Sequence, residues 1–107
     1  MKRLLTLSIL LGTLFPGVYS EETGWSYKQT TLQSFYMFYN GGDITVDGEA
    51  LTSDDVIGAF SADGVCVGWT YATMDGNNYI TVPTVGDDGS DYSGNYLGSG
   101  DIPTFKI

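Results

Sequence analysis

Apolar, aromatic and β-branched residues occur in short runs separated by turns that contain glycine, and this pattern predicts β-strands. The runs Val56–Phe60 and Val65–Ala72 flank the turn Ser61–Gly64. The remaining predicted strands are Ser34–Tyr39, Ile44–Val46, Tyr79–Val85 and Thr104–Ile107. No run continues at helical spacing without a glycine. We therefore predict an all-β chain, a small antiparallel β-sandwich of immunoglobulin-like or jelly-roll-like type with about six to seven short strands.

The hairpin formed by Val56–Phe60 and Val65–Ala72 has the most specific predicted register. A four-residue loop would place Ala59 opposite Cys66 and Val56 opposite Trp69. One face would then carry Val56, Phe60, Val65, Val67 and Trp69. Because both faces are apolar, we expect the hairpin at the centre of a sheet, with Cys66 buried and unreactive.

The first twenty residues have the pattern of an export signal. Lys2 and Arg3 precede an apolar run over residues 4–15, and small residues stand at the first and third positions before Glu21. The run is shorter than the roughly 20 residues that span a bilayer. We predict that residues 1–20 are a signal peptide, that the protein is secreted or displayed at the cell surface, and that it keeps no membrane span after cleavage.

The remaining residues, 21–107, are predicted to form a single β-sandwich domain. The whole chain has 13 acidic and four basic residues and a net charge of −9, which becomes −11 without Lys2 and Arg3. Such a charge excludes nucleic acid as a partner, since almost no cation is available for phosphate. Small exported domains often rely on disulfides, but the one cysteine has no partner in this chain.

The residue inventory also argues against an enzyme. The chain has no histidine, so it lacks the usual base of a serine or cysteine nucleophile and the usual ligand of zinc. Two adjacent acid pairs remain, Asp54-Asp55 and Asp87-Asp88. Neighbouring residues of a strand point to opposite faces, so neither pair is expected to converge on a substrate. We predict a protein without catalytic residues.

A long stretch between Val85 and Thr104 is rich in glycine and aspartate. Its carboxylates are Asp87, Asp88, Asp91 and Asp101. Oxygen ligands in a flexible loop suit calcium, although the spacing differs from that of an EF-hand. The alternative is a solvated acidic loop in which the aspartates serve as turn residues, and the pattern favours this alternative. Calcium is thus the one cofactor that the sequence suggests.

Tyrosines supply the candidate ligand-binding residues. Tyr92 and Tyr96 lie in the acidic loop, where we expect them to be exposed, and Tyr71 ends a predicted strand. Aromatic rings with a polar tip stack on sugars and are common in protein interfaces. The expected partner is therefore an extracellular carbohydrate or protein.

Two segments carry a resemblance to a known kind of module. DDVIGAFSADGVCVGW (Asp54–Trp69) and VPTVGDDGSDYSGNYLGSGDIPTFKI (Val82–Ile107) resemble an accessory β-sandwich module of secreted and cell-surface bacterial multidomain proteins. The resemblance implies a non-enzymatic module and assigns no site residues. In those proteins a further strand follows the TFKI segment, so the resemblance implies either that this chain is a truncated copy of a larger module or that something else covers that edge.

Two functions follow from these patterns. The first is a secreted binding or adhesion module that recognises carbohydrate or protein through its tyrosine-bearing loops. The second is a structural or assembly subunit in which an open sheet edge pairs with a neighbouring chain. Thr104–Ile107 is the edge predicted to remain open, with Phe105 and Ile107 on one face and self-association as the result.

Overall fold

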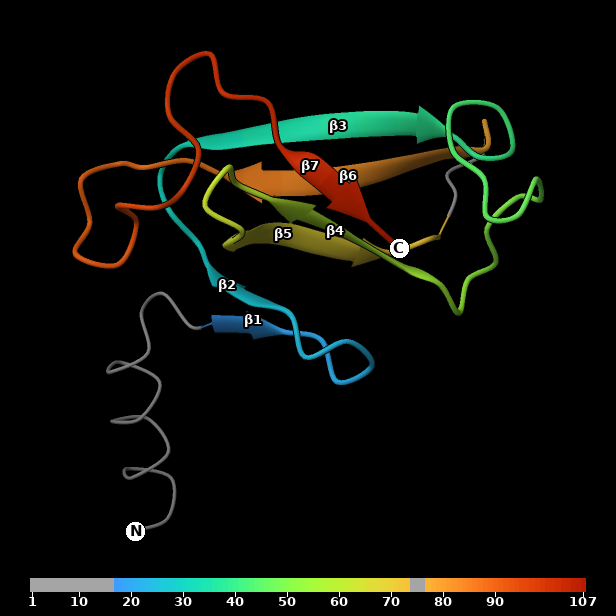
Figure 1. The fold of residues 1–107 in the computed structure, drawn as a ribbon, viewed down its shortest axis with the longest axis horizontal. Helices are drawn as coiled ribbons and strands as arrows, with labels where there is room; N and C mark the ends of the chain where they lie inside the picture. The colour runs from blue at the N-terminus through green and yellow to red at the C-terminus, as the bar shows by residue number, and fades with distance from the viewer. Residues whose placement is uncertain (1–16, 74–76) are drawn as a thin grey trace, which may run out of the picture.

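The computed structural model describes residues 17–73 and 77–107, which form seven β-strands and no helix (Figure 1). The strands are β1 (Gly17–Tyr19), β2 (Ser26–Lys28), β3 (Gln33–Tyr39), β4 (Val56–Phe60), β5 (Cys66–Tyr71), β6 (Tyr79–Val85) and β7 (Thr104–Lys106). They pair in three antiparallel sheets, β1–β2, β3–β6 and β5-β4-β7. The all-β prediction is confirmed. Within the described residues, no helix is long and apolar enough to cross a membrane.

β4 is the centre of the structure, and all five of its residues are buried. The β3–β6 sheet lies on one side of it, and the β1–β2 hairpin lies on the other (Figure 1). On the first side the ring of Phe105 packs against Phe38, with centroids 4.9 Å apart. On the second side Trp25, in the loop before β2, packs edge-on against Phe60 at 5.2 Å. β4 is therefore covered on both faces, as its unbroken apolar sequence requires.

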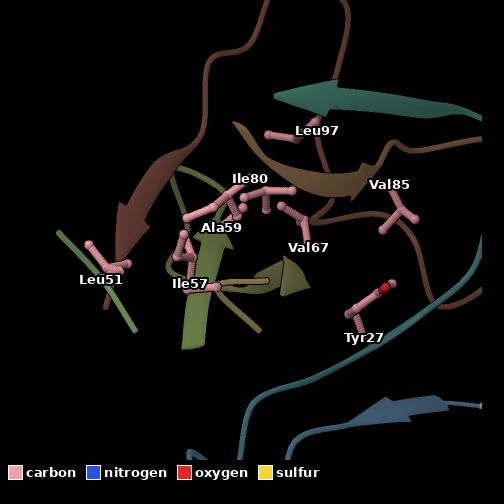
Figure 2. Packing of buried hydrophobic residues seen from close by; sticks show 10 residues of the cluster. Tyr27, Leu51, Ile57, Ala59, Val67, Ile80, Val85 and Leu97 are labelled. Atoms are coloured by element: carbon pink, nitrogen blue, oxygen red, sulfur yellow. The ribbon is translucent and has the colours of Figure 1, made fainter. Parts of the chain in front are cut away.

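The main core lies between β4, β5 and β6 (Figure 2). Ile57, Ala59, Val67, Ile80 and Val82 are fully buried there. β6 contributes through alternation, because Ile80, Val82 and Thr84 are buried and Tyr79 and Thr81 are exposed, although Val85 at its end is buried as well.

The β4–β5 hairpin corrects the predicted register. Ser61 N–H donates to the Val65 carbonyl, so the turn is one residue shorter than expected, and a β-bulge between Ala59 and Phe60 then shifts the pairing further. Cys66 lies opposite Phe60 rather than Ala59, and Tyr71 rather than Trp69 lies opposite Val56. The shorter turn accounts for the first shift, and the extra residue of the bulge adds a second shift to every later partner along β5.

The bulge also changes what each side chain packs against. Val67 joins the core cluster with Ile57 and Ala59, not the face that carries Phe60. Cys66 is only half-buried, and burial raises the pKa of its thiol. The expected central position holds for β4 alone, since β5 is an outer strand of its sheet.

The predicted strand Ile44–Val46 is absent. These residues make only two isolated bridges, between Asn40 and Ile44 and between Val46 and Glu49. Asp47 has a φ of 53°, a left-handed conformation that turns the chain back after only three residues. The segment is therefore a loop.

Residues 17–20 belong to the fold, although the sequence reading excluded them from it. The Val18 carbonyl accepts a hydrogen bond from the Trp69 indole at 3.0 Å, and Ser20 is fully buried. Residues 1–16 of the predicted signal peptide lie outside the described part. Cleavage before Glu21 stays a prediction, and it would remove β1 from the mature chain.

Within residues 17–73 and 77–107, β7 pairs with β4 alone, so its other side is open there, as predicted. The predicted shared face does not form. Phe105 points inward and packs against Tyr36 and Phe38, whereas Ile107 follows the strand and is 49% exposed.

Candidate functional site

A groove of about 320 Å³ lies where the first residues of β3 and the last residues of β6 meet the loop 97–101. Its polar and aromatic lining consists of Gln33, Ser34, Tyr36, Thr84, Asp87, Ser99 and Asp101. No lysine or arginine is among the residues that line it. The groove therefore offers carboxylate, hydroxyl, amide and phenol groups without a cation.

The wall of the groove is a short turn that holds itself in place. Asp101 Oδ2 accepts the Gly98 N–H at 2.7 Å, and the Asp101 N–H donates to the Gly98 carbonyl at 3.1 Å. Leu97 is buried and anchors the turn, because its carbonyl accepts the Asp87 N–H at 2.9 Å. The turn is thus fixed to the end of β6 by an apolar side chain and a backbone bond.

A network of hydrogen bonds around two adjacent carboxylates, those of Asp87 and Asp88, holds the acidic loop together. Asp88 accepts from the Thr31 N–H at 2.8 Å and from the Ser90 hydroxyl at 2.6 Å. The buried Ser93 hydroxyl donates to Asp87 Oδ1 at 2.8 Å and lies 3.3 Å from Asp88 Oδ1. The expected divergence of this acid pair is wrong, because the pair lies in a loop rather than a strand and both side chains turn toward Ser93.

These hydrogen bonds set the charge state of Asp88. The Ser90 hydroxyl, followed by the Thr31 N–H, holds the pKa of Asp88 well below the usual value. Both donors stabilise the ionised carboxylate and would be lost if it took up a proton. The loop is therefore built around a permanent negative charge at neutral pH.

We predict that the contribution of Asp88 to stability disappears in acid. Its pKa is lowered by folding, so the stabilisation is present above the unfolded value of about 4 and falls as the pH drops toward the folded pKa. An Asp88→Asn variant should be less stable than wild type at pH 7, and this difference should shrink below about pH 4. Urea unfolding of both proteins across this pH range measures it, and a pH-independent difference would contradict it.

Tyr92 and Tyr96 anchor the acidic loop instead of standing free. The Tyr92 hydroxyl donates to the Gln29 carbonyl at 2.6 Å, and the Tyr96 hydroxyl accepts the Lys28 N–H at 2.9 Å. The Lys28 ammonium lies 4.9 Å from the centre of the Tyr92 ring. Both rings are half-buried, so the predicted exposure is wrong. The reason is that the last residue of β2 and the residue after it supply backbone partners for the two hydroxyls.

Tyr71 lies apart from this pair. Its hydroxyl donates to Glu22 Oε1 at 2.8 Å, in the turn between β1 and β2, whereas Tyr92 and Tyr96 bond to the backbone at the end of β2. The hydrogen bond raises the pKa of Tyr71 and lowers the pKa of Glu22. The three predicted tyrosines therefore do not form a common surface.

The four predicted calcium ligands do not gather either. Asp87 and Asp88 meet at Ser93, Asp101 closes the turn after Gly98, and Asp91 is exposed. Within the described part of the chain, no three acidic, cysteine or histidine side chains form a group that could hold a metal ion. The arrangement matches the alternative stated above, aspartates that serve as turn residues. Calcium binding remains a prediction without a converging ligand set.

Of the predicted residues, only Asp87 and Asp101 line the groove. Gln33, Ser34 and Tyr36 were missed because they belong to a strand more than fifty residues away in the sequence. Polar residues among the aromatic ones of this strand are the one signal that could have pointed to them.

Comparison of the chain with family models, with curated proteins and with solved structures gives no match. The function proposed below therefore comes from the side chains of the groove.

Proposed function

We propose that the protein is a secreted or surface-displayed binding module without catalytic activity, and that its groove takes a neutral carbohydrate. The observation that carries this proposal is the lining of the groove, which combines Tyr36 and Gln33 with two carboxylates and no cation. Phosphorylated or sulfated ligands would be repelled there. A neutral ligand with many hydroxyl groups fits this chemistry best.

Each polar group has a role toward such a ligand. The loop hydrogen bonds described above use only part of the acceptor sites on the carboxylates of Asp87 and Asp101. The remaining sites can accept hydrogen bonds from sugar hydroxyls. Gln33 and Ser99 can donate as well as accept. Tyr36 contributes an aromatic ring and a phenol to the lining. A protein ligand is the other candidate, and it would use the same acceptors for its own N–H groups.

A pair of glutamines tests the proposal. Gln33 Nε2 donates to Gln29 Oε1 at 3.0 Å, but only Gln33 lines the groove. Both alanine variants remove this hydrogen bond, so Gln29→Ala is the matched control. We expect Gln33→Ala to weaken oligosaccharide binding about fivefold, the effect of one lost hydrogen bond, and Gln29→Ala to leave it unchanged.

Calorimetric titration with neutral oligosaccharides of cellulose, xylan and chitin measures these affinities, with an acidic oligosaccharide as the negative probe. Equal weakening by both variants would place the site elsewhere. Binding of the acidic probe alone would contradict the charge argument.

The finer features of fold and location belong to the same proposal. Packing of the β3–β6 sheet on the sheet of β4 supports a sandwich of immunoglobulin-like or jelly-roll-like type. The charged start, short apolar run and small residues before Glu21 support export. Together they support the resemblance to an accessory module of secreted bacterial proteins.

We predict that the exported protein begins at Glu21. The intact mass of the secreted protein decides this, and a mass that includes residues 1–20 would contradict it. A mature protein that begins there lacks β1, which leaves the Trp69 indole without its acceptor on Val18.

The second candidate function is assembly, which the open side of β7 favours. An incoming strand would pair with the backbone of Thr104–Lys106. Phe105 is unsuitable for testing this idea, since it packs in the core and its replacement would disturb folding. Ile107 is exposed beside the edge, so Ile107→Lys is the appropriate variant.

A further inference from the structure

β3 has an open edge that is longer and less protected than that of β7. Among the residues that the structure describes, it pairs only with β6, and its seven residues carry no charged side chain. Phe35 and Met37 on its outer face are 61% and 57% exposed. Proteins usually protect such edges with charges, proline or a bulge, because an uncovered row of backbone groups pairs with other chains. None of these devices is present in β3.

The register with β6 shows which backbone groups are open. The Asn40 N–H donates to the Asn78 carbonyl, and the Gly86 N–H donates to the Leu32 carbonyl. In an antiparallel pair, hydrogen-bonded positions alternate with positions that face away. The even-numbered residues of β3 therefore bond to β6, and the odd-numbered residues direct their N–H and C=O groups outward.

One end of this outward row is already closed. The Tyr39 N–H donates to Asp43 Oδ2 at 2.8 Å, and the Tyr39 carbonyl accepts from the N–H groups of Gly42 and Asp43. The turn that follows β3 thus covers the last outward position. Gln33, Phe35 and Met37 remain as the outward positions that a partner strand can use.

We propose that this edge pairs with the same edge of a second copy of the chain, antiparallel, with Phe35 opposite Phe35 of the second copy. The outward N–H and C=O groups of one strand must bond to those of the other. A symmetric antiparallel register must therefore pair odd-numbered residues with odd-numbered residues. The register centred on Phe35 pairs Gln33 with Met37 and uses all three open positions. Centring on Tyr36 or Met37 would bring Tyr39 and its covering turn into the partner strand. The chosen register forms about six backbone hydrogen bonds and joins the two sheets into one.

A second copy is the occupant that fits this edge, because β3 is uncharged and its three open positions pair with themselves about a two-fold axis. Like-charged copies of a chain with a net charge of −9 repel one another, least where the approaching strand is uncharged. A basic partner would be attracted to the acidic loop rather than to this neutral edge. The pairing also places Phe35 against its own copy, and Met37 beside Gln33, on a face that is now exposed.

The β3 edge differs from the β7 edge in its length and in its lack of charge. β7 has three residues and carries Lys106, two features that discourage pairing. The edge shares Gln33 with the groove, but the inference rests on the backbone groups of β3 and does not depend on either proposed function. Its test can therefore separate the two edges.

The mass of the protein in solution, measured by light scattering from micromolar to millimolar concentration, tests the proposal. We expect wild type to approach the mass of a dimer and Phe35→Lys to raise the dimer dissociation constant at least about tenfold, because two like charges then face each other across the axis. Thr81→Lys is the matched control: Thr81 is exposed and lies opposite Met37, one strand away from the edge. It should leave the dimer intact. Ile107→Lys should also leave it intact, and loss of the dimer in that variant would assign assembly to β7.

Cross-linking tests the register itself in a Cys66→Ser background. Hydrogen-bonded partners lie about 5.5 Å apart at Cα, within the range of a disulfide. Phe35→Cys should therefore form a disulfide-linked dimer under mild oxidation, whereas Met37→Cys should do so only with Gln33→Cys. A wild type that is monomeric throughout, a dimer lost equally in Thr81→Lys, or cross-linking of Met37→Cys with itself would each overturn the proposal.

Discussion

Replacing Gly68 by alanine is expected to destabilise the protein by about 4 kcal/mol, a large part of the total stability of a small domain. A Cβ at this position would lie 1.8 Å from the Pro83 carbonyl oxygen. The obstacle is backbone, so no side-chain rotation relieves the overlap. β5 would have to move away from β6, and the core between them would open.

Pro83 explains why the two strands approach so closely at this point. It lies opposite Phe35, at a position of β6 that does not bond to β3, so its missing N–H removes nothing from that pair. Its carbonyl faces Gly68 instead. The glycine and the proline thus allow contact between two strands that belong to different sheets.

Gly94→Ala is the matched control for this substitution. Gly94 is exposed, lacks a positive φ, and has no atom within 4 Å of the added Cβ, so its replacement should change stability by less than about 0.5 kcal/mol. Urea unfolding of both variants gives the difference. A Gly68→Ala protein with wild-type stability would show that β5 and β6 do not pack this closely.

Asn40→Ala is expected to reduce the free energy of unfolding by about 3 kcal/mol, the second largest effect. The Asn40 side chain acts as a substitute for a strand partner. Its Nδ2 donates to the Leu51 carbonyl at 2.9 Å, and its Oδ1 accepts the Leu51 N–H at 2.8 Å. Both residues are buried, so alanine would leave two backbone groups of Leu51 without partners and without water.

The same substitution at an exposed asparagine, Asn95→Ala, should have almost no effect and serves as the control. Amide hydrogen exchange gives a second readout, because the Leu51 N–H should exchange much faster in Asn40→Ala. A loss below about 1 kcal/mol with unchanged exchange at Leu51 would contradict the role assigned to Asn40.

Several strands were predictable because their signals are local. β6 was predicted with its observed bounds, and β3, β4, β5 and β7 were predicted to within one residue at each end. Alternation of apolar and polar residues and the glycine turns between runs act over a few residues, and no distant contact is needed to recognise them. Ile44–Val46 had the same local pattern but failed, because the left-handed turn at Asp47 follows too soon for a strand.

The short strands β1 and β2 carried no such signal. Gly17–Tyr19 lies in a segment that also reads as the end of an export signal, and Ser26–Lys28 alternates polar and apolar residues over only three positions. What holds them in place is tertiary: the Trp69 indole bonded to Val18 and the Trp25 ring against Phe60.

The sequence by itself determined the chemical inventory, which is acidic, almost without cations and without histidine, and it determined where most strands form. Only the tertiary structure decided the register of β5, the groove and the open edge of β3. Each of these depends on contacts between segments that are distant in the chain. Gln33 and Asp101 share the groove because β3 and the last loop meet, and the β5 bulge brings Val67 into the core beside Ile57. The local propensity of a segment for strand or turn contains no information about such long-range contacts, because these are set by how whole strands pack.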